Sequence, residues 1–223
     1  TNKKSSLSHY FLDIDHDLQL ENFDSSDLKL SIKKVSNDTY LKIFDQHITK
    51  SSLRPENFDN LNSSLKLFLN HEDFIFETGI LSFEDLQIEN KSDRYQYNLP
   101  YYNYDKLVEQ NYFDGTIDFN SNGNNYLSET NKLETNIINN LIYNSTDYIS
   151  DFGLKNNFSL SLKNLNSIGK KTSQYKSNPQ MEIASLFNVD FSMPLEKKSN
   201  NSNNILIPKI SFRFNPSDMK DYS

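Results

Sequence analysis

Acidic and histidine side chains are the residues of this sequence whose types could support catalysis or metal binding. Asp13, Asp15 and Asp17 alternate along one predicted strand face, where two of them could act as the acid and the nucleophile of a glycosidase. An alternating acidic row is more often a solvated strand face, and we favour that interpretation. The histidines lie apart, without the i, i+4 spacing of a zinc-binding helix: His9, His16, His47 and His71. We therefore predict no catalytic residue, no metal site and no enzymatic activity.

Motifs for a nucleophile, a nucleotide or a thiol centre are missing from the sequence. Asp45-Gln46-His47 could orient an imidazole, but no Gly-x-Ser-x-Gly motif accompanies it. Ser121-Asn122-Gly123-Asn124 predicts a turn rather than a phosphate-binding loop, so no cofactor is expected. The 223 residues include no Cys, which excludes disulfides and Cys-ligated zinc. With 30 acidic against 23 basic residues, the net charge of -7 gives no basic surface for nucleic acid.

The elements that position these residues are predicted to be antiparallel strands. The chain has 16 Phe and 13 Tyr but a single Ala (Ala184), a composition that favours strands over helices. Apolar and polar residues alternate in 10–20, 27–33, 61–70, 157–163, 182–193 and 205–214, and more weakly in 73–81, 95–104 and 112–120. Segment 131–142 has apolar spacing that also fits a helix, and we predict a strand there. These segments amount to about ten strands.

The spacing of the predicted strands differs from that of a soluble β-sandwich. One strand occurs in roughly 22 residues, whereas the strands of soluble sandwiches repeat about every 8–12 residues. The mean hydropathy is -0.72, and no 18-residue apolar stretch predicts a transmembrane helix. Asn-rich runs at Asn120–Asn125 and Asn200–Asn204 are predicted loops, as is the long connection 42–60. Alternating strands of about ten residues between unequal polar loops favour an outer-membrane β-barrel.

Three segments, in this order, resemble the β-barrel part of the lipopolysaccharide-assembly outer-membrane proteins, the LptD or organic solvent tolerance family. The first is Val35–Asp45, the second is Asn98–Tyr104 with its Leu-Pro pair, and the third is Leu206–Pro216 with a proline at each side of a short strand. The residues that carry the resemblance are Val35, Ser36, Asp38, Tyr40, Leu99, Pro100, Pro208 and Pro216.

The resemblance implies a large transmembrane barrel that inserts lipopolysaccharide into the outer leaflet of a Gram-negative outer membrane. It implies lipopolysaccharide, outer-membrane lipids, a plug lipoprotein (LptE) and a periplasmic bridge protein (LptA) as partners. Residues 1–223 would form one fragment from the middle of the barrel, without the family's periplasmic jelly roll and barrel ends. The start at Thr1 rather than Met agrees with an excerpt or a processed chain. Candidates for the lumen wall are Lys29, Ser31, Lys33 and Lys66.

Other functions stay open on the sequence. A porin or receptor barrel would keep the alternation without the three ordered segments. A secreted, soluble β-protein that binds carbohydrate would also alternate, and it would need no detergent. A glycosidase that uses the Asp13–Asp17 row is the last alternative.

Overall fold

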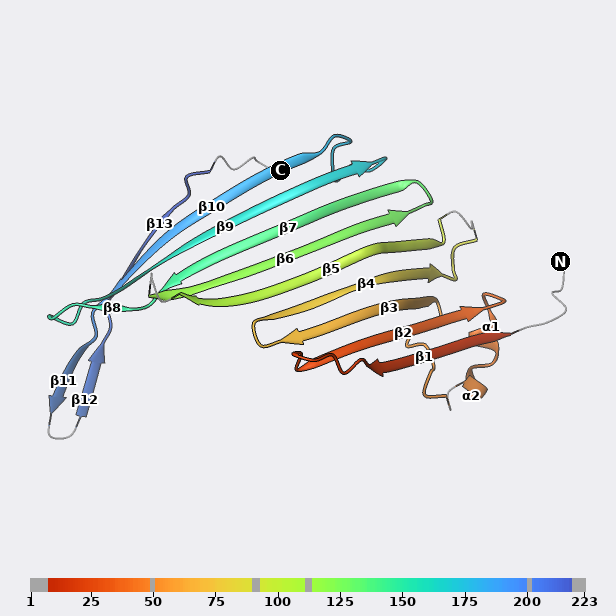
Figure 1. The fold of residues 1–223 in the computed structure, drawn as a ribbon, viewed down its shortest axis with the longest axis horizontal. Coiled ribbons are helices and arrows are strands. Elements are labelled where there is room, and N and C mark those ends of the chain that lie inside the picture. The colour runs from red at the N-terminus through yellow and green to blue at the C-terminus, as the bar shows by residue number, and fades with distance from the viewer. Residues whose placement is uncertain (1–7, 49–50, 90–92, 111–113, 200–201, 218–223) are drawn as a thin grey trace. The chain divides into compact units, whose positions relative to one another are not determined.

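The computed structural model describes residues 8–48, 51–89, 93–110, 114–199 and 202–217. This part of the chain contains thirteen strands and two short helices, which confirms the prediction of an all-β protein. Eleven of the strands form one antiparallel sheet in the order β1-β2-β3-β4-β5-β6-β7-β9-β10-β13, with β8 paired to β9. The remaining two, β11 and β12, form a separate hairpin. From β1 to β7 consecutive strands are neighbours in the sheet (Figure 1), although the β2–β3 connection is long and contains both helices.

The elements have the following bounds. The strands are β1 His9–Asp17, β2 Ser25–Val35, β3 Asn60–His71, β4 Phe74–Asp85, β5 Tyr95–Gln110, β6 Gly115–Ser128, β7 Lys132–Ser145, β8 Tyr148–Ile149, β9 Lys155–Lys170, β10 Gln180–Ser192, β11 Leu195–Ser199, β12 Ser202–Leu206 and β13 Lys209–Phe214. The helices are α1 Tyr40–Ile43 and α2 Asp45–Ile48.

Strict alternation located the strands correctly, and the ambiguous segment 131–142 is indeed strand β7. Two predictions about the connections were wrong. The predicted strand 205–214 divides before Lys209, because Leu206 pairs in the β11–β12 hairpin whereas β13 pairs with β10. The predicted loop 42–60 begins in α1 and contains α2. The strands β8 and β11, together with the division of segment 205–214, explain why more than ten strands are present. Tyr112 and Phe113 of the weak segment 112–120 lie outside the described residues.

The predicted Asn-rich turn is also wrong, because Asn120–Asn125 and Ser121–Asn124 lie within β6. Neighbouring strands satisfy the amides there: Asn98 of β5 donates to Asn124 at 2.9 Å and accepts the Asn125 backbone N–H at 3.0 Å. Gly123 is buried because the Tyr102 ring of β5 lies over its Cα. On β4, Gly79 is covered in the same way by Tyr101. A glycine beneath an aromatic ring of the next strand is a known means of fixing strand register.

The chain divides into two compact units. The first consists of Thr1–Tyr104, Asn122–Ile137 and Asn166–Gln180, and the second of Asp105–Ser121, Ile138–Leu165 and Met181–Ser223. The prediction of a single barrel domain over residues 1–223 stays a prediction.

A small hydrophobic core lies in the first unit, where α1 and α2 pack on the sheet. Leu41 and Ile48 are buried with Val35, Leu61 and Leu86. The side chains packed around this cluster are Phe11, Tyr40, Phe44 and Phe58. Asn37 starts the first helix by accepting the Thr39 backbone N–H at 2.9 Å, an Asx turn. Both helices belong to the β2–β3 connection and lie at that end of the sheet (Figure 1).

In the second unit, β10 and β13 pair so that apolar side chains lie on one face and polar side chains on the other. Phe187 lies opposite Phe214, and Val189 lies opposite Phe212. On the other face, Asn188 lies opposite Arg213, and its amide accepts from the guanidinium at 3.4 Å. The predicted separation of apolar and polar residues in 182–193 is therefore confirmed.

Candidate functional site

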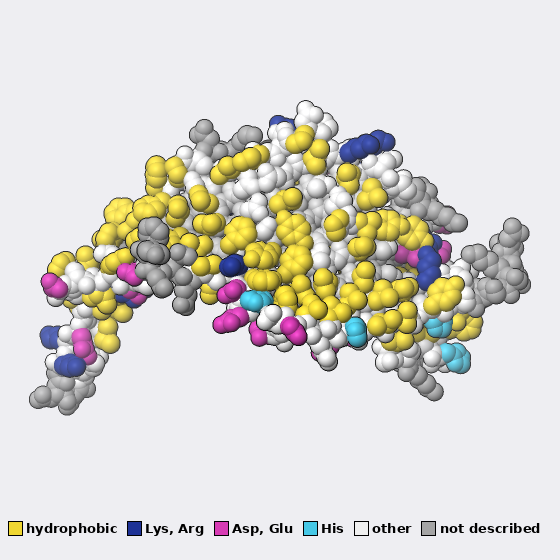
Figure 2. Space-filling model, in the orientation of Figure 1, with side chains coloured by type: hydrophobic (Ala, Val, Ile, Leu, Met, Phe, Trp, Pro, Cys, Tyr) yellow, Lys and Arg dark blue, Asp and Glu magenta, His cyan; other side chains and the backbone are white. Residues whose placement is uncertain are grey.

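Strands β1–β3 have one mostly apolar and one mostly polar face, whereas the neighbouring strand β4 carries apolar side chains on both faces. On the apolar face a row of aliphatic side chains crosses all four strands, with each residue directly opposite the next: Ile14, Leu30, Leu65 and Ile80. We call these four residues the aliphatic row. Ile14, Leu65 and Ile80 are 40–47% exposed, so no layer of the described protein covers them. Figure 2 shows hydrophobic side chains spread widely over the strands on the face in view.

The polar face carries the residues that the sequence predicted as a lumen wall. Lys29 lies opposite Lys66 on β3 and forms a 3.1 Å ion pair with Asp15 on β1. Ser31 donates to Asp13 at 2.6 Å. Lys33 lies opposite Phe11 on the same face. The structure therefore brings Lys29, Ser31, Lys33 and Lys66 together on one face, and their assignment to a lumen stays a prediction.

The carboxylates of the acidic row are spread along β1, and each faces a different residue of β2. Asp13 accepts from a serine and Asp15 pairs with a lysine, while Asp17 lies opposite Asp27. The histidines are likewise dispersed. His9 packs against Tyr40, and His71 stacks on Phe74 with ring centroids 5.0 Å apart. Within the described residues no group of acidic or histidine side chains could hold a metal ion.

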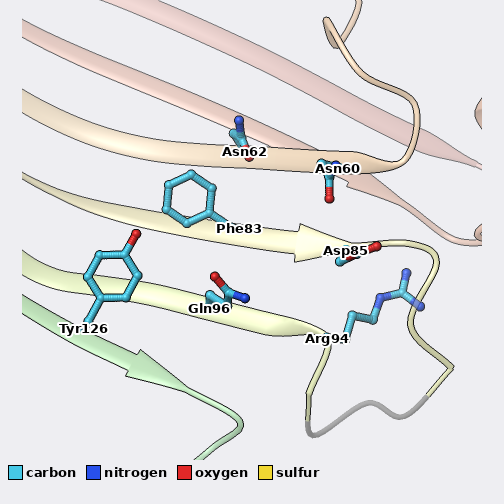
Figure 3. Close-up of a pocket in the computed structure, with 7 residues that line it drawn as sticks. All are labelled: Asn60, Asn62, Phe83, Asp85, Arg94, Gln96 and Tyr126. Carbon is cyan, nitrogen blue, oxygen red and sulfur yellow. The ribbon is translucent and has the colours of Figure 1, made fainter. Parts of the chain in front are cut away.

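A shallow pocket of about 300 Å³ lies on the polar face of the first unit (Figure 3). Its lining consists of three side-chain amides, two aromatic rings and two charged groups: Asn60, Asn62 and Gln96, then Phe83 and Tyr126, then Asp85 and Arg94. Strand register explains part of this arrangement, since Asn60 lies opposite Asp85 and Asn62 opposite Phe83. The pocket is thus a continuation of the polar face that bears Lys29 and Lys66.

A buried ion network lies beside the pocket, and the sequence analysis missed it. Glu84, 6% exposed, accepts from the Arg94 guanidinium at 2.9 Å and from Lys34 at 2.9 Å. The same guanidinium donates to Asp38 at 2.7 Å, and the Tyr95 hydroxyl donates to Glu84 at 2.9 Å. The hydrogen bond to Asp38 raises the pKa of Arg94, and the Glu84 carboxylate acts in the same direction. The cation of the pocket is therefore already neutralised by two carboxylates.

The residues that carry the family resemblance lie in the hydrophobic core, in the ion network and in or beside strands. Val35 and Tyr40 belong to the hydrophobic core and its surroundings, and Asp38 belongs to the ion network. Ser36 accepts the Ser8 backbone N–H at 2.8 Å, which closes the end of the β1–β2 pair. The others lie in or beside strands: Leu99 and Pro100 within β5, joined by a cis peptide bond, Pro208 before β13, and Pro216 after it.

A second ion pair holds the β2–β3 connection. Lys42 of α1 lies 2.5 Å from the Asp59 carboxylate just before β3. The hydrogen bond from this ammonium group lowers the pKa of Asp59. This pair ties α1 to the end of the connection, and the pair of Asp38 with Arg94 ties the start of the connection to the residue before β5.

Neither models of known protein families nor curated proteins give a match to this sequence. No helix in the described part of the chain is long and apolar enough to cross a membrane.

Proposed function

We propose that this chain forms part of a transmembrane β-barrel of a Gram-negative outer membrane, in the translocon that inserts lipopolysaccharide into the outer leaflet. The observation that supports the barrel is the aliphatic row with its exposed neighbours on one face and hydrogen-bonded polar side chains on the other. Lipid acyl chains match the first face, and a hydrated lumen matches the second.

The balance of buried and exposed apolar side chains supports lipid rather than water on the apolar face. In the described residues six hydrophobic side chains are buried, whereas 28 large ones are exposed. Soluble monomers rarely expose contiguous apolar patches of more than a few hundred Å². A sheet with so small a core would gain less from folding in water than one with a covered apolar face, because these exposed side chains would stay partly hydrated.

The lipopolysaccharide substrate rests on the three ordered segments that resemble the LptD family. In this proposal the plug lipoprotein LptE occupies the lumen, and the bridge protein LptA delivers the lipid to a periplasmic domain of the longer protein. Lys29, Ser31, Lys33 and Lys66 belong to the hydrated wall. The barrel needs no catalytic residue, since it positions the lipid without making or breaking covalent bonds.

Two measurements test the proposal. The first is fractionation of cells that express the protein with its export signal, and we expect it in the outer membrane, resistant to carbonate extraction. Recovery in the soluble fraction would favour the secreted carbohydrate-binding alternative. The second is depletion of the protein in the bacterium that encodes it, where surface lipopolysaccharide should fall while porin levels are maintained. Unchanged surface lipopolysaccharide would contradict the translocon and leave the porin or receptor barrel.

A further inference from the structure

The pocket on the polar face carries hydrogen-bonding groups that the described protein does not use. The amides of Asn60, Asn62 and Gln96 and the hydroxyl of Tyr126 make no hydrogen bond to another described residue. Other side chains of β5 and β6 differ: the amides of Asn98 and Asn125 are bonded across neighbouring strands. Each free amide offers two N–H donors and a carbonyl acceptor. The free groups thus gather in one concave place.

Two aromatic rings give this pocket apolar walls. Phe83 projects from β4 and Tyr126 from β6, and the amide of Gln96 on β5 lies between the strands that carry them (Figure 3). Tyr126 is 38% exposed, so its ring is open to a ligand. A ligand that fits must therefore present apolar C–H surface to the rings and, at its edge, several hydroxyl or amide groups to the free amides.

The charges of the pocket argue against an ionic ligand. The Arg94 guanidinium is bound by Glu84 and Asp38, so it has no unpaired charge to attract an anion. Asp85 would repel an anion, and one of its oxygens already accepts the Gln87 backbone N–H at 2.8 Å. A simple cation would leave the amide N–H donors and the two rings without a role. A neutral, polyhydroxylated ring satisfies all of these groups.

We propose that this pocket binds a neutral pyranose unit of a saccharide, with its C–H face against Phe83 or Tyr126 and its hydroxyls on Asn60, Asn62, Gln96 and Asp85. The volume of about 300 Å³ lies at the lower end of the usual range for ligand pockets and suits one sugar ring rather than a long chain. For so small and open a site the expected dissociation constant is on the order of millimolar. The site does not rest on the proposed membrane function, since the argument uses only the residues that line the pocket, all of which belong to the first unit.

The test is saturation-transfer NMR on the intact protein folded in detergent micelles. The probes are free glucose, galactose and N-acetylglucosamine, and in a second arm the lipid-free core oligosaccharide released from lipopolysaccharide. Binding of either probe supports the pocket, and the arms distinguish a general hexose site from one for the headgroup of a membrane glycolipid. If neither probe binds at about ten times the expected dissociation constant, the proposal is wrong.

Variants link the binding to these residues. Asn62→Ala combined with Gln96→Ala removes two of the free amides, and binding should weaken at least about tenfold. Tyr126→Phe keeps the ring and removes only the hydroxyl, so it should weaken binding less than Tyr126→Ala. Asn70→Ala is the matched control, because Asn70 lies on the same strand and face as Asn62 but outside the pocket. Circular dichroism confirms that each variant is folded. Equal binding by the double variant and the control would place the sugar elsewhere.

Discussion

The apolar face of β1–β4 can be tested with one pair of lysine substitutions. Leu65 is the sixth of the 12 residues of β3, and it lies in the middle of the aliphatic row between Leu30 and Ile80. If this face contacts lipid, Leu65→Lys brings an ammonium group close to the bilayer midplane. The expected loss in the free energy of unfolding is about 2 to 4 kcal/mol. That loss is roughly a 30- to 700-fold change in the folding equilibrium.

Ser64→Lys is the matched control, since Ser64 directly precedes Leu65 on the same strand and lies opposite Ser31 on the polar face. Its expected effect is within about 0.5 kcal/mol, as for an ordinary hydrated surface. The assay is urea-dependent folding into phospholipid vesicles, with the free energy of unfolding extrapolated to water for both variants. Leu65 is 40% exposed, so in a soluble protein its substitution by lysine would also cost little. Equal, small losses for the two variants would therefore refute the lipid-facing assignment.

Four further substitutions test the contacts that hold the first unit together. Glu84→Gln should lower the free energy of unfolding by roughly 3 kcal/mol, because it leaves a buried guanidinium with one carboxylate fewer. Asp45→Asn, at an exposed ion pair, should change the same quantity by less than about 0.5 kcal/mol. Gly79→Ala should cost about 1 to 3 kcal/mol, since its methyl group would clash with the Leu65 backbone carbonyl oxygen and lie 2.9 Å from the Tyr101 ring. The lowered pKa of Asp59 means that its pair with Lys42 stabilises the fold above about pH 4 and loses this effect as the pH falls through the lowered value. Lys42→Met should raise the Asp59 pKa toward its usual value in an NMR titration of the carboxylate.

The sequence predicted the strands well where a single face alternates without interruption. In β2 and β3, for example, Leu30 and Leu65 were placed on the apolar face, and the strand register confirms this. Alternation with period two is a local property of the chain, so it can be detected without knowing the partner strand. The polar-face position of Lys29 and Lys66 follows from the same pattern.

Features that depend on a partner strand could not be predicted. Gly123 with its Asn neighbours has the local composition of a turn, and only Tyr102 and Asn98 on β5 explain why it continues as a strand. The ion network joins Glu84 to residues 10 and 50 positions away in the sequence. One local signal existed, because Glu84 occupies a position of β4 that belongs to the apolar face, where an unpaired carboxylate would be costly.

The two faces of the sheet make the membrane proposal and the saccharide proposal independent. The aliphatic row depends on side chains such as Leu65, whereas the pocket depends on Asn62 and Gln96, which lie outside the apolar face. Leu65→Lys should therefore impair folding into vesicles but leave saccharide binding intact in whatever fraction of the protein folds in micelles. The double amide variant should bind the sugar at least about tenfold more weakly and still fold into vesicles with the wild-type free energy. Loss of both properties in either variant would mean that the pocket and the apolar face are energetically coupled, contrary to the separation of the faces by strand register.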